Sequence, residues 1–555
     1  MVSTPLLDAV YRGNATRVAA LIKAGAKVNQ ANEFGATPMS QAALRGDTAI
    51  LRLLLAAGAD PESANAEGET ALMVVARTGN VEAAKLLVEA GAKVNQANEF
   101  GATPMSQAAQ RGDAAILRLL LAAGADPESA NAEGESALMV VARTGNVEAA
   151  KLLVEAGAKV DAREKWGGQT ALLWAAAQNQ PAMINYLVSK GAKVDARSAV
   201  RDWPRRMTAE ERPKDMNRGG MSGLMFAARD GHLEAMRALL KAGADPDFTD
   251  PDGSTPLIVA LMNGHWDAAK LLIDSGADVN IWDWWGQSPL YMAVDMHTLP
   301  TGARTELPTM DHATGMDIIK LLIAKGANVN AQLKLRPPYR QVSQDRLADP
   351  AIDYGATPLL RAAKAADIDA MQALLAAGAL VDLANAYNHT PLIVAAGASR
   401  GRATPTRGGN YTEDQAIDAV KLLLAHGANV NASGFKGKTT DRGEVLHCTG
   451  YVIIEDCYKG ETAMHGAALH GWMKLAEVLK QAGANLDAVD ADGKTPLDYA
   501  MGRYRLGFLE NQPEPQLKVA AALRALGATK DTASAPPLPP GARPVVVAEV
   551  PIVPY

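Results

Sequence analysis

The chain has 555 residues, of which 48% are apolar and 21% charged, and a formal net charge of -6. This mild acidity argues against a dedicated nucleic-acid binder, which needs a basic surface to displace counterions from phosphates. No apolar run reaches the roughly 18 to 20 residues that span a bilayer, and the opening MVSTPLLDAVYRGN lacks the features of a signal peptide. We therefore expect no membrane span and a cytoplasmic protein by default, with a periplasmic or secreted protein as the alternative.

A short motif with a leading Thr or Ser recurs along the chain, mostly at intervals of 33 residues. It first occurs as TPLL at Thr4 and last as TPLD at Thr495. Between these it returns at Thr37, Thr70, Thr103, Ser136, Thr170, Ser222, Thr255, Ser288, Thr357, Thr390 and Thr462. A fixed period of this length indicates a repeat array. We expect an all-α repeat solenoid of about thirteen stacked repeats over residues 1–529, in place of the several domains that the length suggests.

Each repeat has the marks of two short helices. In the second repeat, Thr37 is a favourable N-cap, and Pro38 stands at the first helical position, where a missing N–H costs nothing. The first helix, PMSQAALRG, ends at Gly46, and the second, TAILRLLLAAG, ends at Gly58. Pro, Asn and Gly in ADPESANAEGE then supply an extended turn. Because neither helix is long enough to be stable alone, the repeats must stack.

Residues 252–280, DGSTPLIVALMNGHWDAAKLLIDSGADVN, match the ankyrin-repeat pattern nearly position by position. The sequence resembles the ankyrin-repeat family over about residues 3–529, and its long insertions are similar to those of bacterial arrays that are often exported. The resemblance implies two antiparallel helices and a projecting β-hairpin per unit, in a protein that binds other proteins and is not an enzyme. The family's usual TPLH keeps its histidine only at His465, in TAMH, and the resemblance implies that this side chain hydrogen-bonds the neighbouring repeat.

Residues 27–92 and 93–158 are nearly identical. They differ only at Leu44/Gln110, Thr48/Ala114 and Thr70/Ser136. So close a match indicates a recent duplication of a two-repeat block. We expect this amino-terminal part to be scaffold and the functional residues to lie further along the chain.

Five insertions interrupt the repeats, all of them after residue 195. They fall on the hairpin side at 197–220, 332–355 and 433–460, and between the helices of one repeat at 297–313 and 397–412. Long loops without secondary structure of their own are usually functional or disordered. Three on one edge, two or three repeats apart, favour a wall around a groove. The first insertion is rich in basic residues, which either favour an acidic partner or only keep the loop solvated.

Three tryptophans, Trp282, Trp284 and Trp285, stand in the single turn NIWDWWG. Aligned with the turn NEFG that precedes Thr37, this places Trp284 and Trp285 at a hairpin tip. The resemblance implies that tips and first helices contact partners, and that a protein or peptide binds along the concave face of repeats six to eleven. The predicted binding residues are Trp166, Trp174, Trp203, Trp282, Trp284, Trp285, Tyr354 and Tyr387.

The alternative is that these rings pack beneath the long insertions and only order them. Against it, a tip tryptophan has no core within its own repeat, and clustered exposed aromatics are costly unless they anchor something. Both interpretations stay open on the sequence alone.

Cys448 and Cys457 are the only cysteines, and both lie in the third hairpin insertion. Their separation in HCTGYVIIEDCY suits a disulfide across a β-hairpin, which favours an oxidising compartment. Free thiols are one alternative. A metal site with His447 and His465 is another, although the spacing matches no zinc pattern.

Other candidate chemistry is sparse. Polar residues that are candidates for a cation site occur at Asp295, His297, Asp311, His312 and Asp317. Such residues are more often solvated loop polars. Phosphate-binding glycine loops, nucleophile elbows and paired-carboxylate signatures are absent from the sequence, so we expect no cofactor and no resident metal.

The Pro-rich tail, 530–555, cannot continue the helices. It is either disordered or docks as an added strand. The sequence as a whole predicts a non-catalytic scaffold with a protein or peptide partner. One alternative is a metal-binding or enzymatic site built from the insertions that carry Cys and His. The other is self-assembly through the tryptophans and the tail.

Overall fold

The computed structural model of the chain describes residues 4–65, 67–201, 219–297, 310–335, 354–398, 411–434, 460–503 and 515–532. These residues form 26 helices, and the only strand-like pairings among them are isolated β-bridges. They divide into two compact units, unit 1 up to Asp250 and unit 2 from Pro251. The all-α repeat fold is confirmed. The count of thirteen repeats and the single domain over 1–529 stay predictions.

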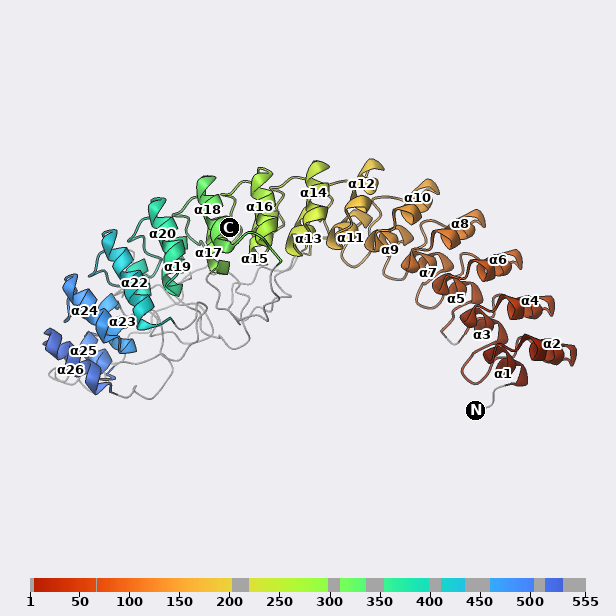
Figure 1. Cartoon of the computed structure of the whole chain (residues 1–555), viewed down its shortest axis with the longest axis horizontal. Coiled ribbons are helices and arrows are strands. Elements are labelled where there is room, and N and C mark those ends of the chain that lie inside the picture. Colours follow the sequence, from red (N-terminus) through yellow and green to blue (C-terminus); the bar gives the residue numbers. More distant parts are fainter. Residues whose placement is uncertain are drawn as a thin grey trace, which may run out of the picture. The chain divides into compact units, whose positions relative to one another are not determined.

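The helices of both units are labelled in Figure 1. Unit 1 contains α1 (Pro5–Tyr11), α2 (Ala15–Lys23), α3 (Pro38–Arg45), α4 (Thr48–Ala56), α5 (Ala71–Thr78), α6 (Val81–Glu89), α7 (Pro104–Arg111), α8 (Ala114–Ala122), α9 (Ala137–Thr144), α10 (Val147–Glu155), α11 (Ala171–Ala177), α12 (Pro181–Ser189), α13 (Gly223–Arg229) and α14 (Leu233–Lys241). Unit 2 contains α15 (Pro256–Met262), α16 (Trp266–Asp274), α17 (Pro289–His297), α18 (Gly315–Ala324), α19 (Pro358–Ala365), α20 (Ile368–Ala376), α21 (Pro391–Ala395), α22 (Glu413–Ala425), α23 (Ala463–His470), α24 (Met473–Gln481), α25 (Pro496–Ala500) and α26 (Leu517–Leu526).

Local capping sets the short length of these helices. At the start of α3, the N–H of Ser40 donates to the hydroxyl of Thr37 (3.1 Å), and the N–H of Thr37 donates to the hydroxyl of Ser40 (3.0 Å). The helix ends where Gly46 turns left-handed, with φ of 68°. Asp47 then starts α4 by accepting the N–H of Ile50 (3.1 Å). Each end is therefore fixed by residues that the repeat supplies itself.

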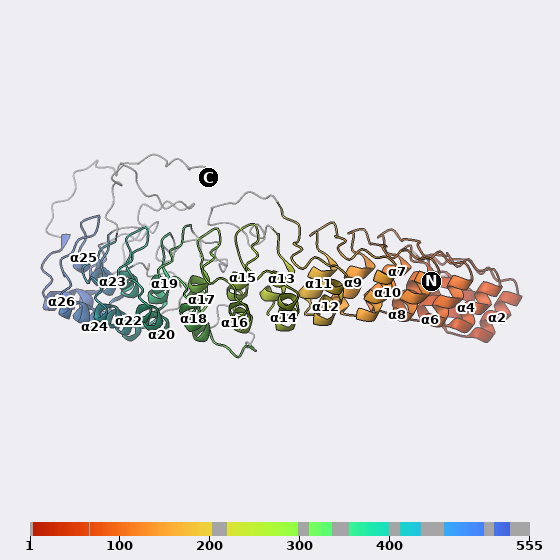
Figure 2. The same cartoon turned by 90° about the horizontal axis from the view of Figure 1, so that it is seen from above.

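Each unit is built from two rows of helices. In both units the odd-numbered helices pack on one another, as do the even-numbered ones. Figure 2 shows the connections between successive pairs projecting from one side of the rows. In α4, Ile50, Leu51 and Leu54 are fully buried, and each such side chain contributes about 1.5–3 kcal/mol. Stacking thus supplies the stability that a single helix pair lacks.

Asparagine side chains link the turn after one helix pair to the turn after the next. In unit 1, the carbonyl oxygen of Asn95 accepts the N–H of Asp126 (2.8 Å), and its amide donates to the carbonyl of Gly124 (3.1 Å). In unit 2, Asn280 binds Asn328 (2.8 Å) and the carbonyl of Gly326 (3.1 Å) in the same way. Where a Val-Asn pair follows a second helix, as at Asn95 and Asn280, its asparagine therefore hydrogen-bonds the next repeat.

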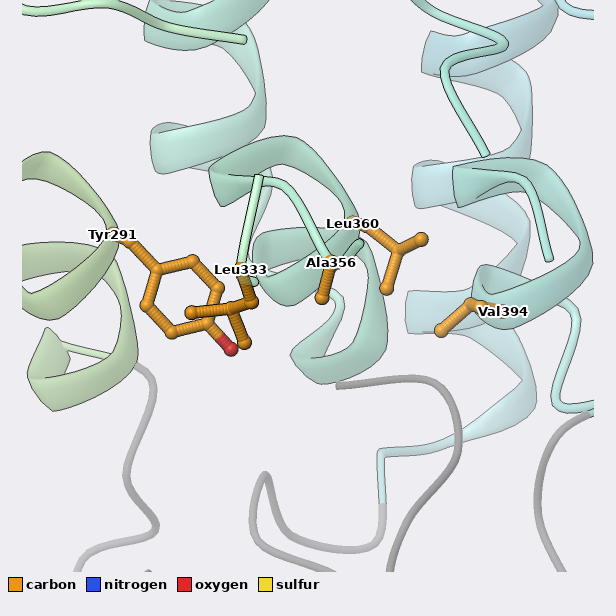
Figure 3. Close-up of a cluster of buried hydrophobic side chains, with 5 residues drawn as sticks. All are labelled: Tyr291, Leu333, Ala356, Leu360 and Val394. Carbon is orange, nitrogen blue, oxygen red and sulfur yellow. The ribbon is translucent and has the colours of Figure 1, made fainter. Parts of the chain in front are cut away.

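The described ends of the hairpin-side insertions are paired with each other. The N–H of Leu333 donates to Ala356 (3.0 Å), and the N–H of Gly355 donates to Leu333 (2.8 Å). Figure 3 shows Leu333 and Ala356 in a buried cluster with Tyr291, Leu360 and Val394. These residues come from α17, α19, α21 and the hairpin between α18 and α19. The stack therefore continues across an inserted segment because the two ends of that segment pair at the base of the hairpin.

Candidate binding surface at the hairpin tips

In both units, a carboxylate or amide side chain shapes the turn at hairpin tips that the structure describes. In unit 1, Asn32 Oδ1 accepts the N–H groups of Phe34 (3.0 Å) and Ala36 (2.9 Å). In unit 2, Asp283 Oδ1 does the same for Trp285 (3.0 Å) and Gln287 (2.8 Å). The turn itself is thus made by the first residue and the backbone, which leaves the side chain two positions later free to vary.

The tip that carries three tryptophans is fastened to both neighbouring hairpins. The N–H of Trp284 donates to Asp252 (2.7 Å), and the N–H of Lys334 donates to Trp285 (2.9 Å). A Cβ at Gly286, whose φ is 81°, would lie 2.6 Å from the nitrogen of Lys334. Only glycine tolerates both the positive φ and the close approach of Lys334. The two backbone hydrogen bonds hold this tip in place from both sides.

The three indoles of this tip differ in exposure. Trp282 is 47% exposed, whereas Trp284 and Trp285 are half-buried. The Nζ of Lys334 lies 3.1 Å from the centroid of the Trp282 ring, a cation–π contact worth about 0.5–1 kcal/mol at an exposed site. Lys334 belongs to the hairpin insertion 332–355. The contact is therefore of the kind required by the alternative interpretation, in which the tryptophans pack beneath the insertions and order them. The remaining exposed surface of Trp282 is what a partner would meet.

Trp166 is the most exposed of the predicted binding residues that the structure describes. Its side chain is 78% exposed, and its N–H donates to Glu164 (2.5 Å). Glu164 also accepts the N–H groups of Gly167 and Gln169 (both 2.8 Å). Glutamate stands here where the turn at Phe34 has Asn32, and this turn is one residue longer. The guanidinium of Arg201 lies 5.0 Å from the Trp166 ring centroid.

Trp174 lies on α11 and is half-buried. The guanidinium of Arg143, from the end of α9, is 5.2 Å from its ring centroid. Its indole N–H is shielded from solvent and has no acceptor among the described residues. A buried donor without an acceptor is uncommon, which singles out this side chain among the predicted binding residues.

Tyr387 occupies the same position in its turn as Phe34 and Trp285 but is only 3% exposed. Its ring contacts that of Tyr354 edge-on, with centroids 6.4 Å apart, and the N–H of Ala386 donates to Tyr354 (2.9 Å). Tyr387 was expected to be displayed at a tip. It is buried instead, because the ring of Tyr354, from the preceding hairpin, covers it. Tyr354 itself is half-buried.

The remaining predicted residues lie elsewhere. Trp203, Cys448, Cys457 and His447 lie outside the described residues, so the disulfide stays a prediction. His465 is fully buried. Its Nδ1 accepts the N–H of Thr462 (3.1 Å), and its Nε2 lies 3.0 Å from the carbonyl of Lys494, so it spans two repeats as the resemblance implied.

The candidate cation site over 295–317 is not formed, because its members point to separate partners. Asp295 binds Arg361 (2.5 Å), and His297 binds Asp367 (2.6 Å). His312 binds Asp267 (3.0 Å). Asp311 accepts the N–H of Trp266 (2.8 Å), and Asp317 caps α18 at Thr314. Among the described residues, no group of three or more His, Cys, Asp or Glu side chains is arranged to hold a metal.

Two of these pairs shift the pKa of a titratable group. The hydrogen bond that His297 donates to the Asp367 carboxylate raises the pKa of His297, although burial opposes this. Burial disfavours the ionised form of Asp267, but the backbone N–H groups of His312 and Ala313 outweigh it and lower the pKa of Asp267. Asp367 binds a residue at the start of the insertion 297–313, and Asp267 binds a residue near its end. Both carboxylates therefore have a structural role.

Phe34 and Phe100 were not predicted as binding residues, yet they are 66% and 62% exposed. They stand on tips of the duplicated block, which the sequence suggested was scaffold. The sequence did contain a signal for their exposure, because both residues occupy the position in the turn that Trp166 occupies in its own turn.

Stacked helix pairs linked by hydrogen-bonded hairpin turns define a helical repeat protein of the ankyrin type. The family model for ankyrin repeats in three copies matches residues 6–98, 105–198 and 224–332. A single ankyrin-repeat model matches residues 387–434. These matches cover more than half of the chain, which therefore belongs to the ankyrin-repeat family.

Ankyrin repeats generally mediate protein–protein interaction, and proteins of this family are typically scaffolds without catalytic activity. Within the part of the chain that the structure describes, no helix combines the length and apolarity needed to cross a bilayer.

Proposed function

We propose that this chain is a non-catalytic scaffold that binds a protein or peptide through the hairpin tips and odd-numbered helices of repeats six to eleven. The proposed contact residues are Trp166, Trp174, Trp203, Trp282, Trp284, Trp285, Tyr354 and Tyr387. The tip at Trp282–Trp285 carries the proposal, because it combines an exposed indole with a backbone fastened on two sides. A rigid, partly exposed aromatic anchor is the usual centre of a binding hot spot.

The competing role for the same tip is support of the insertion that Lys334 begins. Both roles use the Trp282 ring, but they differ in what depends on it. A supporting ring adds stability and no affinity. A binding ring adds affinity and little stability, since an exposed aromatic is not needed for the fold.

The test is an affinity capture with wild-type protein beside a Trp282→Ala, Trp284→Ala, Trp285→Ala variant, with captured proteins identified by mass spectrometry. We expect at least one protein to be retained by the wild type and lost with the variant. Leu380→Ala is the matched control, because Leu380 is an exposed apolar side chain of unit 2, 58% exposed, outside the proposed site. Its captured set should equal that of the wild type.

Urea unfolding of the same proteins separates the two roles. Equal capture by wild type and variant, together with lower stability of the variant, would make the tryptophans a support for the insertion and would end the binding proposal for this tip.

A further inference from the structure

Exposed aromatics occupy every second hairpin tip in unit 1. Phe34, Phe100 and Trp166 are 66%, 62% and 78% exposed and lie at the same position of turns two repeats apart. The intervening tips carry the exposed glutamates Glu67 and Glu133 at that position. We call these five side chains the tip row.

The turns do not require the aromatic rings. Asn65 Oδ1 accepts the N–H groups of Glu67 (3.1 Å) and Glu69 (2.8 Å), which is the bonding that Asn32 gives to Phe34 and Ala36. Glutamate and phenylalanine therefore serve the same turn equally well. The rings are therefore not present for the sake of the turn, and it is their regular spacing along unit 1 that carries the inference.

The turns that carry the first four members of the tip row are also acidic, whereas Lys165 stands beside Trp166. Glu33 and Glu99 stand beside the two phenylalanines and are exposed, as are Glu67 and Glu133. None of these four carboxylates takes part in an ion pair with another described residue, whereas the exposed carboxylate of Glu82, on an even-numbered helix, pairs with Arg52 at 2.7 Å. The negative charge of the tip row is therefore available to a cationic partner.

The arginines at the ends of the odd-numbered helices of unit 1 are, in contrast, engaged. Arg45 donates to the carbonyl of Tyr11 (2.8 Å), and Arg77 pairs with Glu69 (3.1 Å). These arginines are held by other groups and leave the carboxylates of the tips unpaired.

One cation already occupies the face of a tip aromatic. The guanidinium of Arg201 lies 5.0 Å from the Trp166 ring centroid, within the range of a cation–π contact. Phe34 and Phe100 offer the same kind of ring face, each beside a glutamate.

We propose that the tip row of unit 1 binds an extended, arginine-bearing segment of a partner protein, with guanidinium groups on the aromatic rings and beside the glutamates. This extends the proposed function to a part of the chain that was expected to be scaffold, and it shares only Trp166 with that proposal.

The spacing of the tips sets the spacing of the arginines. Packed helix layers lie about 8–10 Å apart, so alternate tips are about 16–20 Å apart. An extended chain advances about 3.3 Å per residue, which places successive arginines about six residues apart. Because an even separation keeps side chains on one face of an extended strand, two such arginines reach Phe34 and Phe100. A third reaches Trp166, whose side chain stays 78% exposed although Arg201 lies on one face of its ring.

The probe is a dye-labelled Gly/Ser/Thr peptide of about fifteen residues with three arginines about six residues apart, a separation set by the rise of an extended chain. A second peptide of the same composition has its three arginines adjacent. Fluorescence anisotropy with the full chain should give about five- to tenfold tighter binding of the spaced peptide, as expected for two further cation–π contacts. Equal affinity for the two peptides overturns the proposal, because only net charge would then matter.

The decisive variant is Phe34→Glu with Phe100→Glu. Glu67 and Glu133 show that the turn accepts glutamate at this position, so folding should be retained. The variant adds negative charge while it removes two rings. We expect weaker binding of the spaced peptide by about fivefold, from the loss of two cation–π contacts, whereas tighter binding would show that the rings are not used.

The matched control is Leu44→Gln. Leu44 is 53% exposed in α3, and the duplicated block has Gln110 at the equivalent position, so this variant removes an exposed apolar side chain without touching the tips. It should leave peptide affinity unchanged, and an equal loss in this control would contradict the proposal.

Two further measurements separate this proposal from others. The Trp282→Ala, Trp284→Ala, Trp285→Ala variant should bind the spaced peptide as the wild type does, so failure of the unit 2 site leaves this result intact. Concentration-dependent mass of the wild type that the double glutamate variant abolishes would make a second copy of the chain the occupant and overturn the proposal.

Discussion

The tips of unit 1 and unit 2 use one turn but display their aromatic residues differently. Phe34 in unit 1 and Tyr387 in unit 2 stand at the same position of an asparagine-shaped turn, yet they are 66% and 3% exposed. The ring of Tyr387 is covered by Tyr354 from the preceding hairpin. In unit 1 the neighbouring tip presents a glutamate in place of a ring. The environment that adjacent repeats provide, and not the turn, decides whether an aromatic is displayed.

The largest expected effect on stability concerns a buried ion pair of unit 2. Arg361 is fully buried and lies 2.5 Å from Asp295. Asp295→Ala should destabilise unit 2 by about 3–5 kcal/mol, because it removes a carboxylate that lies against a buried guanidinium. Urea unfolding followed by circular dichroism measures this. Asp8→Ala in unit 1, which removes the exposed partner of Arg12, should cost under about 1 kcal/mol. Equal effects would erase the contrast between the units.

The next effect compares the two turn-forming side chains. Asp283 is 1% exposed and holds the N–H groups of Trp285 and Gln287, while Asn98 forms the equivalent turn at a half-buried position. Asp283→Ala should cost about 1–3 kcal/mol, because its turn donors become buried without an acceptor. Asn98→Ala should cost about 1 kcal/mol, because water replaces the lost acceptor. Thermal unfolding of the two variants gives the comparison, and a larger loss for Asn98→Ala would contradict it.

A pH dependence should appear in unit 2. The pKa of His297 is raised by Asp367, so the folded state holds the proton more tightly than the unfolded chain. The resulting stability is fully present below the unfolded histidine value of about 6.5 and is lost as the pH rises through the higher folded value. Chemical unfolding at a series of pH values should show this loss for the wild type and its absence in His297→Gln. An unchanged pH profile in that variant would mean that the pair carries no linkage.

The smallest expected effect concerns the cation that lies on the Trp282 ring of unit 2. Lys334→Ala removes the ammonium 3.1 Å from the Trp282 ring and should cost at most about 1 kcal/mol. The exposed fraction of Trp282 should rise, and acrylamide quenching of tryptophan fluorescence should increase accordingly. A loss of several kcal/mol would instead show that this contact holds the insertion in place.

The repeat architecture was readable from the sequence because it depends on local rules. Thr37 caps its helix, Gly46 ends it, and Leu51 and Leu54 mark the buried face, as their spacing predicted. The candidate site was only partly readable. Trp166 and Trp282 are exposed as expected, but Tyr387 is buried, and the exposed Phe34 and Phe100 were passed over as members of a duplicated scaffold.

The residues considered as a candidate cation site over 295–317 do not come together, for a related reason. His297 and His312 are close in sequence, but the first binds Asp367 and the second Asp267, which belong to different repeats. Proximity along the chain does not determine which residues of the neighbouring repeats a side chain meets.

The sequence by itself determined the helix pairs, their caps and their period, because capping, helix termination and amphipathic spacing act within a few residues. It also determined the family, since the 33-residue motif returns in register along the chain. The tertiary structure alone decided which aromatics reach the surface and which charged groups are paired. Those outcomes depend on contacts between side chains a whole repeat or more apart, such as Lys334 with Trp282 and Arg361 with Asp295.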